Sequence, residues 1–101
     1  LPKKPTTKEI AAIKKVNIKQ AAATQFKYFV IKADSATYGY SIYANGNLYI
    51  EQKNIPAIAG NKGFTDTTSA ANTAKLVIQK LKQGEMPPTI NITDLKNIKA
   101  L

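Results

Sequence analysis

The chain has 101 residues, a hydrophobic share of 44% and a net charge of +9, values that fit one small globular domain. Cysteine and histidine are both absent, which excludes disulfides, thiolate catalysis and sulfur-ligated metals and removes the commonest general base. The 6 carboxylates are scattered singly, so we expect no enzymatic activity, no catalytic residues, no cofactor and no metal site.

All of the positive charge comes from lysine, because arginine does not occur. Arginine makes the bidentate contacts to phosphate and guanine on which nucleic-acid readers rely, so its absence argues against that class. Two interpretations remain. The lysines reflect the composition of an AT-rich genome, or they alternate with aromatic residues on a single-stranded nucleic-acid-binding surface, as in Lys27, Tyr28, Phe29 and Lys32.

Residues 1–22 are built differently from the rest. The opening "LPKKPTTKE" is rich in proline and lysine, which predicts a flexible basic tether over 1–22, followed by a single domain over 23–101. A frayed helix is the alternative, because Thr6 and Glu9 have the spacing of a capping box. Such a basic segment also allows peripheral association with an anionic membrane. Because the chain begins at Leu1 rather than Met, we expect a processed or trimmed product.

Residues 26–34, "FKYFVIKAD", are β-branched and aromatic and predict a strand, with a turn over 34–37. Residues 38–52 predict a β-hairpin around Asn45-Gly46. The hairpin has four even-numbered residues that suit one buried face, namely Tyr40, Ile42, Leu48 and Ile50. A shared face requires an odd loop length, which predicts the three-residue loop 44–46 with Gly46 in the left-handed position of a bulge and excludes a two-residue turn.

The same parity places Tyr43 and Tyr49 together on the opposite face of the hairpin. There they are either contact residues for a partner or packing residues against the first strand or the leader.

The stretch "IPAIAGNKGF", residues 55–64, is too apolar for an exposed loop. We expect a crossover that closes the core, with Ile55, Ile58 and Phe64 buried and with positive φ at Gly60 or Gly63. A ligand loop is the alternative, although the stretch lacks phosphate-loop spacing.

A helix is predicted over 67–83, with Asp66 at its start and Gly84 just past its end. Its apolar residues form one stripe, namely Ala70, Ala74, Val77, Ile78 and Leu81. Leu76 falls outside this stripe, and we expect the "PPTINI" segment, which can run extended, to cover it. Thr93 is the expected cap of a short C-terminal helix. The elements together predict an α+β fold: an antiparallel sheet of about three strands with one main helix packed on one face, plus the short C-terminal helix.

Two long segments, "YGYSIYANGNLYIEQKNIPAIAGNKGF" and "SAANTAKLVIQKLKQGEMPPTINITDL", resemble a family of small uncharacterised exported proteins and lipoproteins of bacteria, classified as a domain of unknown function. The resemblance covers about residues 26–98. Asp94 stands where the family more often has glutamate. The matching positions are Gln52, Ile55, Pro56, Gly60, Phe64, Ala70, Ala74, Lys80, Pro87, Pro88 and Leu95.

The resemblance implies export, either to the periplasm or to a lipid-anchored position at the bacterial outer membrane or cell surface. A lipid-anchoring cysteine just before Leu1 would account for the tether. We therefore expect a non-enzymatic envelope or cell-surface module whose partner is an envelope protein or a cell-surface component. The alternative is a small basic single-stranded nucleic-acid-binding domain. A weaker alternative is a hydrolase with a lysine base and a serine or threonine nucleophile, but candidates such as Ser41 and Ser69 have no motif around them.

Overall fold

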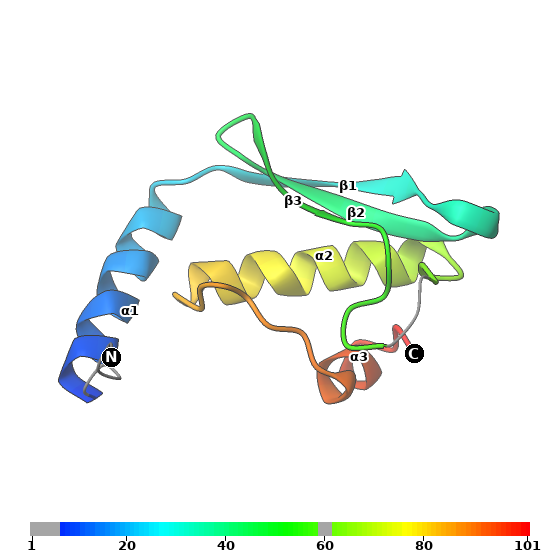
Figure 1. Ribbon diagram of the computed structural model, residues 1–101. Helices are drawn as coiled ribbons and strands as arrows, with labels where there is room; N and C mark the ends of the chain where they lie inside the picture. Colours follow the sequence, from blue (N-terminus) through cyan, green and yellow to red (C-terminus); the bar gives the residue numbers. More distant parts are fainter. Residues whose placement is uncertain (1–6, 59–61) are drawn as a thin grey trace, which may run out of the picture.

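The computed structural model describes residues 7–58 and 62–101. The protein is an α+β fold in which a three-stranded antiparallel sheet has the strand order β1-β2-β3 (Figure 1). The main helix α2 packs across one face of this sheet, and the short helix α3 lies near the C-terminus (Figure 1). The bounds are α1 Thr7–Ala22, β1 Phe26–Lys32, β2 Tyr38–Ala44, β3 Asn47–Gln52, α2 Thr67–Lys82 and α3 Ile92–Asn97. The predicted fold class is confirmed.

Helix α1 occupies most of the region for which a flexible tether was predicted (Figure 1). A helix was the alternative there, and its predicted cap Thr6 lies outside the described residues. The helix contacts α2, and the Asn17 side-chain amide donates a hydrogen bond to the Gly84 carbonyl at 3.2 Å. Residues 7–22 are therefore not an extended spacer, while the boundary at 22/23 stays a prediction.

Strand β1 runs over Phe26–Lys32 and pairs with β2 along its whole length. It ends before the predicted residue 34, because Asp34–Ala36 form a 3-10 turn that leads into β2. Phe26, Tyr28 and Val30 alternate along β1 and pack against the buried core. This alternation assigns the even-numbered side of β1 to the face that packs on α2.

The hairpin differs from the prediction at its turn. Ala44 pairs with Asn47, so Asn45 and Gly46 form a two-residue loop. Both loop residues have positive φ, 51° and 84°, as a type I′ turn requires. The register shifts at Ile42/Tyr43, which identifies a β-bulge on β3. The three-residue loop is thus wrong, because a bulge inside the strand pair makes the parity correction that the loop was expected to make.

The bulge redistributes the hairpin side chains. Ile42 pairs with Ile50 as the expected parity requires, but Tyr43 pairs with Leu48 and leaves Tyr49 as the extra residue. Leu48 is 56% exposed, so its predicted place on the buried face is wrong. Tyr49 lines a pocket beside α2 instead of sharing the face of Tyr43.

Helix α2 confirms the predicted stripe. Ala70, Ala74, Val77 and Leu81 are buried in the core, with Ile78 half-buried against it. Asp66 caps the helix, since its carboxylate accepts a hydrogen bond from the Ser69 N–H at 2.6 Å. The stripe missed two buried residues of α2, Ser69 and Thr73, because both are polar. Thr73 is fully buried, and its hydroxyl donates a hydrogen bond to the Ser69 carbonyl at 2.9 Å.

The crossover after β3 closes the core through Phe64. Its backbone exchanges two hydrogen bonds with Tyr38, at 2.7 and 2.8 Å, and its ring is fully buried. Ile55 was predicted to be buried and is half-buried. Ile58 is 38% exposed, so its predicted burial is wrong.

The backbone angles of the crossover also differ from expectation. Among the described residues of the crossover, Ala57 has positive φ, at 66°. Gly60 lies outside the described residues. Gly63 is required for close approach rather than for positive φ, because a Cβ there would lie 2.7 Å from the Tyr38 carbonyl oxygen.

The C-terminal segment enters the core through Ile90 and Leu95, which are both buried. The cap of α3 is Asn91 rather than the predicted Thr93. Asn91 Oδ1 accepts from the Asp94 N–H at 2.8 Å, while Asp94 Oδ2 accepts from the Asn91 N–H at 3.1 Å, a reciprocal capping box. Leu76 is half-buried and shares a shallow depression with Ile98, which follows α3.

Candidate functional site

The face of the sheet that points away from α2 carries a row of large side chains across all three strands. Phe29 of β1 and Tyr43 of β2 meet edge-to-face, with ring centroids 5.5 Å apart and an interplanar angle of 86°. Leu48 of β3 is the register partner of Tyr43. We call Phe29, Tyr43 and Leu48 the outer-face row.

Two members of the outer-face row are strongly exposed. Phe29 is 53% exposed and Leu48 56%, whereas Tyr43 is half-buried between them. Lys27 pairs with Tyr43 from the β1 side and borders the row with a positive charge. Ser41, the register partner of Phe29, is buried. The row is therefore an aromatic and aliphatic surface with a rigid strand backbone beneath it and a cation at its edge.

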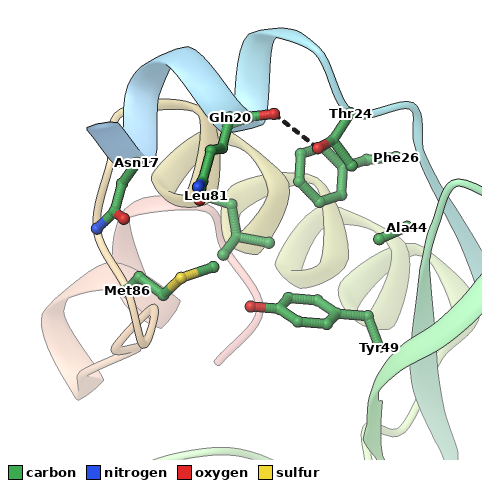
Figure 2. Close-up of a pocket in the computed structure, with 9 residues that line it drawn as sticks. Asn17, Gln20, Thr24, Phe26, Ala44, Tyr49, Leu81 and Met86 are labelled. Carbon is green, nitrogen blue, oxygen red and sulfur yellow. Dashed lines mark hydrogen bonds between the residues drawn. The ribbon is translucent and has the colours of Figure 1, made fainter. Parts of the chain in front are cut away.

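The predicted tyrosine pair is thus split between two sites. Tyr43 is on the outer face and packs against Phe29 of the first strand, one of the two placements that were expected. Tyr49 points toward Leu81 and Met86 (Figure 2). Leu48 was predicted on the buried face, and Phe29 was named only as a nucleic-acid contact, although its odd position in a half-buried strand was a usable signal for the outer face.

The pocket that receives Tyr49 has a volume of about 130 Å³ and lies between α1, the hairpin and the end of α2 (Figure 2). Phe26, Leu81 and Met86 supply much of its apolar wall, while Asn17 and Gln20 of α1 stand at one side (Figure 2). The Thr24 hydroxyl donates to the Gln20 carbonyl at 2.7 Å and fixes the end of the helix. The pocket has room for no more than a small apolar group, which is comparable to a single benzene ring.

The perturbed titratable groups among the described residues have structural roles. Lys80 donates to Asp94 Oδ2 at 2.9 Å, and this hydrogen bond is the main cause that lowers the pKa of the Asp94 carboxyl. The hydrogen bond from the Ser69 N–H likewise lowers the pKa of Asp66. Burial raises the pKa of Tyr40 to about 12. These groups cap helices, tie α2 to α3 or fill the core.

Residues considered for catalysis or metal binding are not gathered into a site in the described part of the chain. Ser41 and Ser69 are both buried. Within residues 7–58 and 62–101 no three carboxylates come together as a metal site would need. The described helices include none with the length and apolar character needed to cross a bilayer.

The lysine and aromatic residues considered for nucleic-acid binding are separated by the sheet. Lys27 and Phe29 lie on the outer face, but Tyr28 packs against the core on the inner face. Phe29 is the aromatic residue of that set left free to stack on a base.

Comparison with known proteins adds a family to this description. No curated protein and no solved structure matches the chain. Residues 30–97, from β1 to the end of α3, match a family described as Domain of unknown function (DUF4907), and the chain belongs to this family.

Proposed function

We propose that this protein is a non-enzymatic module, exported to the bacterial envelope or cell surface, that binds another protein through the outer-face row. The observation that supports this is the exposure of Phe29 and Leu48 on either side of Tyr43. Aromatic and large aliphatic side chains on a rigid strand bury much area on binding at low cost in conformational entropy.

The surroundings of the row indicate the chemistry of the partner. Helix α2 covers the other face of the sheet (Figure 1), so binding on the outer face needs no rearrangement of the core. Lys27 stands at the border, and the chain carries a net charge of +9. A partner that brings an apolar patch rimmed by carboxylates would be complementary in both shape and charge.

The binding experiment compares variants on the immobilised protein. Phe29→Ser and Leu48→Ser should lose a protein captured by the parent from an envelope extract, whereas Ile92→Ser, an exposed residue of α3, should retain it. All three side chains are exposed, so the free energy of unfolding of each variant should lie within about 0.5 kcal/mol of that of the parent. Capture by all variants alike would contradict the proposal.

The single-stranded nucleic-acid alternative is tested on the same proteins. It requires oligonucleotide binding that weakens steeply with salt and that Phe29→Ser reduces. Such binding would replace the proposed function. The export part of the proposal rests on the family resemblance and has its own test, fractionation of cells that produce the protein from its natural gene. A purely cytoplasmic product would refute export and leave the binding result standing.

A further inference from the structure

Helix α1 has one side that faces the rest of the domain. Asn17 bonds to the Gly84 carbonyl, and Ala21 is buried. A Cβ added at Gly84 would lie 2.8 Å from the Lys14 carbonyl oxygen and 2.9 Å from Ile18 Cγ1. Residues 14, 17, 18 and 21 have the spacing of one helical side, so the opposite side of α1 faces solvent.

The solvent side of α1 combines aliphatic and basic residues. By helical spacing Ala12, Lys15, Val16 and Lys19 lie on it, with Ile13 at its border. Ile13 is 54% exposed and Val16 53%. Together with Ala12, and with Asn17 at its edge toward the packed side, they line a shallow and mostly apolar hollow on the helix. We call these five residues the outward surface of α1.

We propose that the outward surface of α1 docks on the surface of an anionic phospholipid bilayer. Residues 11–22 contain three lysines and no carboxylate, so this part of the helix is complementary to anionic headgroups. Ile13 and Val16 would enter the headgroup boundary, while the amines of Lys15 and Lys19 reach the phosphates and their alkyl stems lie along the surface. The proposal extends beyond the outer-face row and does not depend on it.

The residue types favour lipid over the other possible occupants. The described α1 residues whose side chains are placed include no aromatic ring on which a base would stack, and the chain has no arginine for bidentate phosphate contacts. A second copy of a chain with a net charge of +9 would meet like charge at this surface. Exposed aliphatic side chains beside lysines suit an anionic membrane surface instead, because the lysine stems can lie along the apolar boundary while their amines reach the phosphates.

The test measures co-sedimentation of the full chain with vesicles. The parent should bind vesicles of phosphatidylglycerol and phosphatidylcholine in equal parts, should bind pure phosphatidylcholine weakly, and should be released by salt. Lys15→Glu/Lys19→Glu should lower the partition coefficient by about 10-fold or more. Ile13→Ser/Val16→Ser should lower it by about 10-fold, since it removes the inserted side chains.

Two matched controls separate the surface from the net charge and from the proposed function. Lys75→Glu/Lys96→Glu changes the net charge equally at exposed positions of α2 and α3 and should leave vesicle binding within about 2-fold of the parent. Phe29→Ser should bind vesicles like the parent even if it loses its protein partner. Should the aliphatic variant lose helical circular dichroism, the lysine pair alone decides the test.

Four results would overturn the proposal. They are a parent that stays in the supernatant, equal binding to neutral vesicles, equal losses in the Lys75→Glu/Lys96→Glu control, and a dimer that Ile13→Ser/Val16→Ser dissociates. Oligonucleotide binding that depends on Lys15 and Lys19, without vesicle binding, would assign the surface to nucleic acid instead.

Discussion

Leu48 pairs with Tyr43 on the outer face of the sheet, whereas Ile50, two residues further along β3, pairs with Ile42 on the face that packs against α2. In a regular strand these two side chains would share one face. Tyr49 is the extra residue between the two pairs, and the bulge turns it toward the pocket beside Leu81 (Figure 2). One bulged residue thus sends an apolar side chain to the surface and completes the outer-face row.

The bulge predicts that two similar substitutions on β3 have very different effects on stability. Leu48→Ala should change the free energy of unfolding by less than about 0.5 kcal/mol, because its side chain is exposed. Ile50→Ala should destabilise the fold by about 2 kcal/mol, because Ile50 packs against the core. Urea melts of both variants check this. Equal losses would instead support the regular three-residue-loop register.

The helix stripe predicts a second contrast. Leu81→Ala or Val77→Ala should cost about 2–4 kcal/mol, since both side chains are buried in the core. Lys75→Ala, at an exposed position of the same helix, should lie within about 0.5 kcal/mol of the parent. The free energies come from urea unfolding. If Lys75→Ala were as costly as Leu81→Ala, the assignment of the helix faces would fail.

The more local a sequence signal is, the better it predicts the structure. The α2 stripe is a periodic pattern within one element, and it identified four of the buried core residues. The Asn45-Gly46 dipeptide indicated the two-residue turn that the structure has. The parity argument wrongly predicted a three-residue loop, because a bulge inside the strands can change which residues share a face. Asn91 was missed as a cap even though Asp94 stands three residues later, which is the spacing of the capping box that the structure has.

The candidate sites were less predictable because they depend on which surfaces remain uncovered. In the sequence Phe29 is one more strand residue, and only the register places it on the face of the sheet opposite to α2. The solvent side of α1 is defined by the contacts at Asn17 and Gly84, and no periodicity within residues 7–22 indicates which side packs. Tertiary placement, rather than propensity, determines both surfaces.

The ion pair between α2 and α3 predicts a loss of stability in acid. The hydrogen bond from Lys80 holds the pKa of the Asp94 carboxyl below the ordinary value for an aspartate, so the folded state favours the ionised carboxylate more than the unfolded chain does. This contribution is present above the unfolded-state pKa and is lost as the pH falls through the lower folded-state pKa. Asp94→Asn removes this pH-dependent contribution, because the amide does not ionise, and it keeps an oxygen that can accept the hydrogen bond from the Asn91 N–H.

Thermal melts over the acid range check the prediction. On going from neutral pH to a pH below 3.8, the melting temperature of the parent should decrease by more than that of Asp94→Asn. Part of the acid sensitivity should persist in the variant, because the pKa of Asp66 is also lowered by its hydrogen bond to the Ser69 N–H. Identical pH profiles for the two proteins would show that the Lys80–Asp94 contact contributes nothing.

Phe64 tests whether the 55–64 stretch is structural or serves a ligand. Its ring is fully buried against Tyr40, with centroids 6.5 Å apart, and its backbone pairs with Tyr38, the first residue of β2. Phe64→Ala should therefore destabilise the fold by about 3–5 kcal/mol, the usual cost of removing a buried aromatic ring. Ile58→Ala is the matched control from the same stretch, because Ile58 is exposed and its loss should cost little. A ligand loop requires the reverse for Phe64, a variant that melts like the parent and loses binding. Thermal melts of the two variants beside the parent distinguish these cases, and an unchanged melting temperature for Phe64→Ala would rule out the structural role.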